Sequence, residues 1–579
     1  MKKIYNILAS AVAVLCLSSC NDIMDVNSTT KLSDVAIWNS EEAAEGYIIA
    51  SYQSFTDHAN VFAVDGNRFY DAYSDLIKST SYDQYGHLYN KTWLLTTSFG
   101  KNNGGNFGIW GEAYGRIKRA NLLLNDLDRY GVPRYGEDWA KVRRAEIRFC
   151  RAINYWFLAR VYGGVIIRTD KSGKSGYTDD GAYPEDCNRA RVSEKETYDF
   201  IIKEMQEAIE DLPLTWKTDK DGDRWNGRAT KGMVYGFLSR IALYAHEWEI
   251  AADAAEQCKT LGGYQLVSDY AKLFNSAFEA DNRKEIIYGI YGLKEYKTHQ
   301  YEMRIRPIGD ASVYKCDLET RFVPTAELAD LYEFKDGTEF DWSTWNRTTV
   351  KHADPFTDRE PRFQATILYN DAAWEGRKIG TYVGQNEADE SKRGLDYFIA
   401  YENAGSTKGH TCTGYYLKKF LIEGNKDFTT DGCWNTDIIL RYAEVLLNKA
   451  EAYAELGKLD KALAAINEVR ARVNLPAKSA ASYGDYESVM KLLRKERCCE
   501  LAGEGLRFWD LWRWRMCGEV INGQKVHGVK VVLRNNGAYR YDKVEADVDE
   551  RIFQDRYYYL SLPAVELTNN NLCVDNPNW

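Results

Sequence analysis

The chain has 579 residues, of which 45% are apolar and 28% are charged, values typical of folded globular proteins. Its formal net charge of -10 argues against nucleic acid as a partner, because binding phosphate needs a basic surface. The 16 Trp, 41 Tyr and 21 Phe provide flat apolar faces that suit sugar rings as well as a protein core, so their number decides neither.

The N-terminus has the layout of a secretory signal. Two lysines precede an apolar run over residues 7–17, which is too short to span a bilayer. The run ends in Leu-Ser-Ser-Cys20, a pattern typical of bacterial lipoprotein signals in which the cysteine is lipidated. The alternative is an ordinary cleaved signal with a chance cysteine. We expect a signal peptide at 1–19, a lipid such as palmitate on Cys20, and a polar tether at 20–40.

Helical periodicity begins at Glu41. Apolar residues recur every three or four positions and predict helices over 110–124, 139–161, 198–212, 230–245 and 248–261. Gly-Gly pairs or a proline follow several of these segments and end the predicted helices.

The segment 441–470 has the clearest pattern and predicts two helices that meet at Gly457. Ala450 and Ala462 fall where two antiparallel helices must approach closely. This is the tetratricopeptide pattern, in which each repeat of about 34 residues forms one helical hairpin. A stack of several such hairpins buries their apolar faces.

The periodicity fades between about residues 265 and 434, where short β-like pieces such as 285–291 lie among Gly, Asp and Thr. We expect loops and small strands laid over the helices, and such loops usually carry function. The predicted fold is therefore mainly α, with a tetratricopeptide-like helical-hairpin scaffold and an irregular loop and short-strand half. We place one domain at 41–579, with helical repeats mainly at 41–264 and 435–520 and the irregular region at 265–434.

A pair of carboxylates can indicate glycoside hydrolysis, a reaction that needs two carboxyl groups about 5–9 Å apart. Glu496, Glu500 and Glu504 recur every four residues on one predicted helix face, interleaved with Arg497, Arg507 and Arg513. Carboxylates beside guanidinium groups stay ionised and make poor general acids. We therefore interpret this segment as a structural ion network.

The sequence shows no other catalytic or metal-binding pattern. It has no G-x-S-x-G motif, no C-x-x-C pair and no two histidines at i, i+4, so we predict no nucleophile, metal or cofactor. We expect the cysteines after Cys20 to be buried free thiols, with a Cys412–Cys433 disulfide as the open alternative.

Aromatic residues in the non-periodic stretches are the better functional candidates. One group lies at 82–93, with Asn, Asp and Lys among the rings, and a second lies at 291–306. Trp342 and Trp345 form a weaker third group, with Trp374 as a further reserve. A neutral oligosaccharide needs an aromatic platform for its ring faces and fixed polar groups for its hydroxyls.

Several motifs, in order along the chain, resemble the SusD/RagB family of bacterial outer-membrane lipoproteins. They are Trp110-x-x-x-Tyr114-x-x-Ile117-x-x-Ala120-Asn121, Arg144 to Val165, Asp358 to Phe363, Gly414 to Phe420, Arg441 to Asn448, Glu496 to Trp514, and Pro563 to Trp579. The chain departs from the family at turn and packing positions, such as Ile166 in place of the usual Pro.

The resemblance implies a surface glycan-binding protein that performs no chemistry and needs no cofactor. Its implied partners are an oligosaccharide or polysaccharide, the outer membrane through the lipid anchor, and a SusC-like TonB-dependent barrel. It places ligand contacts in both aromatic intervals, at Tyr82, Tyr85, Tyr89, Asn90, Trp93, Tyr296, Tyr301 and Arg306. A surface-anchored glycoside hydrolase and a repeat scaffold that binds peptide or protein are the alternatives.

Overall fold

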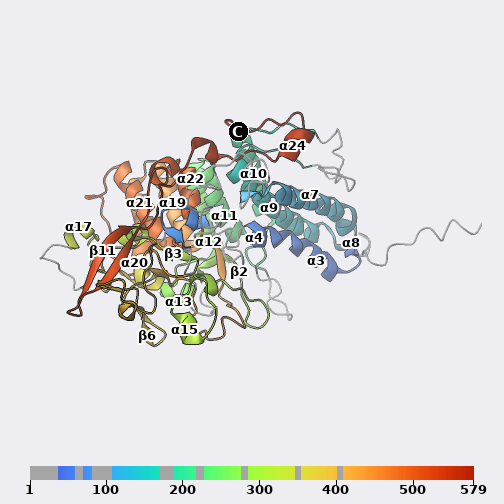
Figure 1. The fold of residues 1–579 in the computed structure, drawn as a ribbon. Helices are drawn as coiled ribbons and strands as arrows, with labels where there is room; N and C mark the ends of the chain where they lie inside the picture. Colours follow the sequence, from blue (N-terminus) through green and yellow to red (C-terminus); the bar gives the residue numbers. More distant parts are fainter. Residues whose placement is uncertain are drawn as a thin grey trace, which may run out of the picture.

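The structure, a computed structural model, describes residues 37–58, 70–80, 107–169, 188–216, 227–275, 284–345, 354–400 and 409–579. Helices dominate and the strands are short, which confirms the predicted mainly α fold (Figure 1). The predicted signal peptide and Cys20 lie outside the described residues. Within those ranges, none of the helices is both long enough and apolar enough to cross a membrane.

One group of helices, blue to teal in Figure 1, surrounds α9. It comprises α3 (Glu41–Ile49), α4 (Gln53–His58), α7 (Trp110–Asp126), α8 (Val132–Tyr135), α9 (Glu137–Tyr162) and α10 (Glu194–Asp211). Because α7 and α10 both pack against α9, nearly every residue from Ala145 to Tyr162 is buried. Gly163 takes a φ of 72° and ends α9, as the Gly-Gly pair predicted.

The helical hairpins continue through the middle of the molecule. They are α11 (Lys231–Tyr244) with α12 (Trp248–Gly262), α19 (Tyr442–Glu455) with α20 (Leu459–Arg472), and then α21 (Tyr486–Leu501) and α22 (Arg507–Arg513). The hairpins stack because α12 packs against α19. Ala450 and Ala462 are fully buried and Gly457 has a φ of 70°, so the predicted close approach and turn are present.

The irregular half consists of short elements. The helices are α13 (Tyr270–Asn275), α14 (Glu302–Ile305), α15 (Asp310–Tyr314), α16 (Ala326–Leu331), α17 (Trp342–Trp345) and α18 (Pro361–Thr366). β2 (Ile286–Ile290) pairs antiparallel with β9 (Asp437–Arg441), and β1 (Ile77–Ser79) with β3 (Phe322–Pro324). β10 (His527–Leu533) lies between β11 (Tyr539–Glu545) and β7 (Val383–Gly384). The remaining pairs are β4 (Ile367–Leu368) with β8 (Tyr416–Leu417) and β5 (Ala373–Trp374) with β6 (Arg377–Lys378).

The predicted ion network is present, but one of its members is not on the helix. α21 ends at Leu501, and Gly503 turns the chain with a φ of 75°, so Glu504 lies beyond the helix. The turn still brings Glu504 beside Glu500, and both carboxylates reach the Arg441 guanidinium at 2.6 Å. Burial alone would raise the pKa of the Glu500 carboxyl, but Arg472, Arg441 and Arg362 outweigh it and hold that pKa well below its usual range.

The arginine partners predicted for these carboxylates were wrong. Arg497 donates to Asp510, Arg507 pairs with Asp75, and Arg513 pairs with Glu451 and Asp510. The glutamates instead take their arginines from elements distant in sequence, at Arg362, Arg441, Arg470 and Arg472. Helix periodicity fixes which side chains share a face, but not which distant element packs on that face.

The cysteines of the described residues are free, and most are buried. Cys412 and Cys433 are both fully buried thiols, so the open alternative of a disulfide between them is not present. Trp509 and Trp512, in α22, lie in the core, whereas Trp514, directly after that helix, is half-buried.

Candidate functional site

A narrow hairpin follows β2 and covers residues 291–299. Leu293 and Lys297 exchange two backbone hydrogen bonds of 2.8 Å. His299 and Cys433 exchange another two, of 2.9 and 2.7 Å, which fasten the base of the hairpin to the segment ahead of β9. The 291–299 hairpin is therefore a fixed projection of the two-stranded sheet formed by β2 and β9.

The hairpin presents apolar and aromatic surface to solvent. Tyr296 is 87% exposed and Leu293 is 59% exposed. Glu295 takes a left-handed φ of 71° at the tip, which turns the chain between these two residues. Beside them, Lys294 Nζ lies 4.9 Å from the ring centroid of Trp434, which is half-buried. An exposed tyrosine of this kind is a ready platform for a flat ligand face.

A cavity of about 260 Å³ opens where the hairpin begins, beside α12 and β2. Four aromatic residues line it, and we call it the aromatic cleft: Trp216, Tyr264, Tyr288 and Tyr291. Thr215, Thr230 and Arg228 contribute polar groups to its wall. Since Tyr291 is two residues from Leu293, the rim of the cleft continues directly into the 291–299 hairpin.

Local packing fixes two of these rings. A Cβ on Gly262 would lie 2.3 Å from the Tyr264 ring, so the glycine at the end of α12 makes the space in which that ring lies. Trp216 donates its indole N–H to the Ala229 carbonyl at 2.9 Å, and the Arg228 guanidinium lies 4.2 Å from its ring centroid. The cleft is thus built before any ligand arrives.

The positive charge of Arg228 is already used in ion pairs inside the protein, so this arginine is not free to bind a ligand. It pairs with Glu45 and with Glu146, and all three side chains are buried. Burial alone would lower the pKa of the Arg228 guanidinium, but Glu146 and Glu45 outweigh it and raise that pKa. The charge of Arg228 is already compensated, so the cleft as a whole suits a neutral ligand better than an anion.

Two of the predicted contacts in this region, Tyr301 and Arg306, lie beneath the surface. Tyr301 packs against Phe420, with ring centroids 6.2 Å apart, and burial raises the pKa of its hydroxyl. Arg306 is fully buried and donates to Glu302 and Asp310 at 2.9 Å and to Glu375 at 3.0 Å. Both side chains hold the irregular half together, and their roles as ligand contacts stay predictions.

The first aromatic interval lies outside the described residues. Tyr82, Tyr85, Tyr89, Asn90 and Trp93 all belong to it, so their contacts stay predictions. Of the reserve candidates, Trp374 is buried and donates to Asp310, while Trp342 donates to Asp330 at 2.9 Å and packs against Phe340. Tyr296 is therefore the predicted contact that the described surface displays most fully.

Sequence reasoning did not single out Trp216 or Tyr264. Each follows a helix end marked by Pro213 or by the Gly262-Gly263 pair, so both rings leave a helix at a turn. Their position directly after a predicted helix end was the feature of the sequence that could have identified both residues as candidates. Among the described residues, no group of three or more His, Cys, Asp or Glu side chains could hold a metal ion.

Comparison with known proteins agrees with this architecture. The family described as "SusD family" matches residues 284–579, and that described as "Starch-binding associating with outer membrane" matches residues 17–243. The chain is 23% identical over 546 residues to SusD-like protein P38 of Formosa agariphila, covering 90% of this chain and 95% of that protein.

Solved structures have the same fold. A SusD-like protein from Bacteroides fragilis is similar with a TM-score of 0.73 and 26% identity, over 94% of this chain and 99% of that one. A SusD-like carbohydrate-binding protein, also from Bacteroides fragilis, has a TM-score of 0.72 and 23% identity, over 93% and 99%.

A stack of helical hairpins joined to an irregular half of short helices, strands and loops defines the fold class of this protein. Within that class, the chain belongs to the SusD family.

Proposed function

We propose that this protein captures an oligosaccharide on the bacterial surface and passes it to a SusC-like TonB-dependent barrel. The observation that carries the proposal is the continuous surface formed by the aromatic cleft and the 291–299 hairpin, in a chain of the SusD family. The B. fragilis relative of the same fold is described as carbohydrate-binding, and the family matched at 17–243 as starch-binding.

The chemistry of the surface suits a neutral sugar. Tyr296 and Tyr291 offer ring faces for the apolar sides of pyranose units, and the threonines and backbone groups of the cleft can pair with hydroxyls. A cavity of about 260 Å³ gives room for part of a chain, while the exposed hairpin leaves the rest in solvent. Because sugar hydroxyls are well hydrated, each hydrogen bond adds little net free energy, and we expect modest affinity.

Anchoring and transfer complete the proposal. Lipidation of Cys20 would hold the protein at the outer membrane, in keeping with the family description that names association with that membrane. The stacked hairpins α11–α12 and α19–α20 offer a broad surface of the kind that repeat proteins use for protein contact. We therefore assign the glycan to the aromatic cleft and the 291–299 hairpin, and the barrel to the surface of the stacked hairpins away from that cleft.

The clearest carboxylate cluster supports binding without cleavage. Glu496, Glu500 and Glu504 are each buried and shared among arginines, so none is poised as a general acid. A hydrolase would need a carboxyl group with a raised pKa beside the scissile bond.

Isothermal titration calorimetry against a panel of neutral oligosaccharides, followed by product analysis, tests the proposal. We expect saturable binding of at least one glycan and no new reducing ends after prolonged incubation. Cleavage of a glycan would identify a surface hydrolase instead. No binding across the panel, with retained binding to the purified barrel, would identify a protein-binding scaffold.

A further inference from the structure

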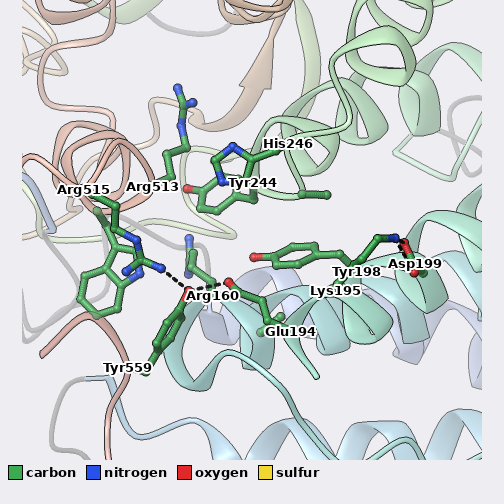
Figure 2. A pocket seen from close by; sticks show the side chains of 13 residues that line it. Arg160, Glu194, Lys195, Tyr198, Asp199, Tyr244, His246, Arg513, Arg515 and Tyr559 are labelled. Carbon is green, nitrogen blue, oxygen red and sulfur yellow. Dashed lines mark hydrogen bonds and ion pairs between the residues drawn. The ribbon is translucent and has the colours of Figure 1, made fainter. Parts of the chain in front are cut away.

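A second pocket lies on the helical side, away from the residues of the aromatic cleft. Its cavity of about 150 Å³ is lined by the last turn of α9, the first turns of α10, the end of α11, the end of α22 and the chain after it (Figure 2). A cavity of this volume holds a molecule of about the size of benzene. The aromatic cleft and this pocket have no lining residue in common.

An uncompensated positive charge lies at this pocket. Arg160, in the last turn of α9, is 7% exposed and lines the cavity. Within the described part of the chain, no carboxylate pairs with its guanidinium and no acceptor takes a hydrogen bond from it, and its Nε is buried without a partner. Other buried arginines of the molecule, such as Arg441 and Arg513, have carboxylates within hydrogen-bond distance.

Aromatic rings offset only part of this isolated charge. The Arg160 guanidinium lies 3.8 Å from the ring centroid of Trp509 and 4.9 Å from that of Trp156. The carboxyl end of α9 also favours a cation. Neither the aromatic rings nor the helix end carries a full negative charge, and a buried ion without a counter-ion is strongly disfavoured. Burial accordingly lowers the pKa of Arg160.

The rest of the pocket adds a second cation and hydroxyl donors. Arg515 is exposed at its edge and forms no ion pair with any described residue; it donates to the Tyr559 hydroxyl. Figure 2 shows the Tyr198 hydroxyl pointing toward the side of the pocket that Arg160 and Arg515 occupy. Tyr244 lines the same cavity.

The two carboxylates that line the pocket already have partners. Glu194 accepts a hydrogen bond of 2.5 Å from the Tyr559 hydroxyl, and Asp199 pairs with Lys195 at 2.8 Å. Arg513, which also lines the cavity, is paired with Glu451 and Asp510. The Tyr559 hydroxyl is neutral and also accepts from Arg515, so the Glu194 carboxylate offsets part of the charge of Arg515. Among the described residues that line the pocket, the cation left without a carboxylate is Arg160.

We propose that this pocket binds a small oxyanion, a carboxylate, sulfate or phosphate group, between Arg160 and Arg515. The guanidinium groups supply charge-assisted N–H donors in planar forks that match an oxyanion, and the tyrosine hydroxyls complete its coordination. The group can belong to a free inorganic anion or to an acidic sugar such as a uronate. The proposal does not depend on the glycan site at the aromatic cleft.

Calorimetric titration of the mature protein at constant ionic strength tests this, with sodium sulfate, sodium D-glucuronate and neutral D-glucose as probes. We expect sulfate or glucuronate to bind and glucose not to bind at this pocket. Binding of sulfate alone assigns the pocket to a free anion, and binding of glucuronate assigns it to an acidic sugar. Absence of binding by both anions would overturn the proposal.

Arg160→Gln and Arg515→Gln are each expected to weaken the binding of the anion at least about tenfold, because each removes a charge-assisted contact. Arg540→Gln, an exposed arginine on β11, is the matched control and should leave it unchanged. Anion binding that Arg160→Gln leaves intact would overturn the proposal. If that variant does not fold, Arg515→Gln, at the exposed edge, decides alone.

The two sites are separable by the same assay. Tyr296→Ala should leave the anion affinity unchanged, and Arg515→Gln should leave neutral glycan binding unchanged. A failure of either site is therefore visible without the other.

Discussion

Arg441 donates hydrogen bonds to both carboxylate oxygens of Glu504, at 2.7 and 2.6 Å, across 63 residues of sequence. The same guanidinium also reaches Glu285 at 2.9 Å and Glu500 at 2.6 Å, and every one of these side chains is buried. One arginine at the end of β9 thus joins the residue before β2, the helix α21 and the turn that follows that helix.

Arg441→Met should destabilise the protein strongly, because it leaves three carboxylates without their shared counter-ion. We expect a loss of about 3–5 kcal/mol in the free energy of unfolding, measured by urea denaturation. Arg540→Met, at an exposed ion pair with Asp542, should change it by less than about 1 kcal/mol. Equal effects of the two substitutions would contradict the role assigned to Arg441.

Replacement of the rings of the aromatic cleft and the 291–299 hairpin should weaken glycan binding without unfolding the protein. Tyr296→Ala, Tyr291→Ala and Trp216→Ala should each lose about 1–3 kcal/mol of binding free energy, by analogy with stacking on other flat ligands, or about tenfold or more in affinity. Tyr486→Ala, a partly exposed tyrosine on α21, is the control. If all three variants fold and bind as the wild type does, the site lies elsewhere, with Tyr82, Tyr85 and Trp93 next.

Gly262→Ala should alter the aromatic cleft indirectly, by displacing the Tyr264 ring that lines it. The added Cβ would lie 2.3 Å from the Tyr264 ring, so that ring must move. We expect a loss of about 1–3 kcal/mol in stability, as for other overpacked sites, together with weaker glycan binding. Gly111→Ala, in α7 with nothing within 4 Å of the new Cβ, should instead stabilise by roughly 0.5–1 kcal/mol. Thermal unfolding and calorimetry of both variants check this.

Acidification should loosen the base of the 291–299 hairpin. Burial lowers the pKa of His299 from 6.5 to about 4, and its Nε2 lies 3.3 Å from the Asn435 carbonyl. Below pH 6.5 the imidazole of His299 is protonated in the unfolded chain, whereas in the folded chain it stays neutral until about pH 4. Stability therefore falls as the pH falls through this window. The lowered pKa corresponds to about 3 kcal/mol of stability between the two ends of this window. Denaturation curves from pH 4 to 7.5 should show this slope in the wild type and a smaller one in His299→Gln.

Cys20→Ala should release the protein from the membrane. The lipid on the cysteine is the proposed anchor, so the variant should appear in a soluble fraction and should not incorporate labelled palmitate. A variant that remained in the outer membrane and still carried the label would contradict the prediction.

The helices followed closely from the sequence, because their apolar faces repeat with a fixed period. The predicted segments 139–161 and 248–261 correspond to α9 and α12 within a residue or two. The boundary that failed was the end of α21, where a period of four continued to Glu504 through a turn made by Gly503. The apolar period of the sequence does not reveal where a glycine adopts a left-handed conformation and ends a helix.

The site was less predictable, because it depends on which distant segments meet. The interval 291–306 contains both the exposed Tyr296 and the buried Arg306, and local sequence does not distinguish them. Arg306 can be buried because Glu375, 69 residues away in the sequence, accepts a hydrogen bond from its guanidinium. Trp216 and Tyr288 of β2 line the same cavity although they are far apart in the sequence.

The pairing of β2 with β9 has a consequence for how such a protein can diversify. Ile290 is paired with Asp437, so the chain leaves the scaffold and returns to it at neighbouring points of one ladder. Surface loops between these points can lengthen or shorten with little entropic penalty, because closure entropy grows only with the logarithm of loop length. The tip of the 291–299 hairpin is therefore suited to vary in length between relatives, while the paired strands at its base stay unchanged.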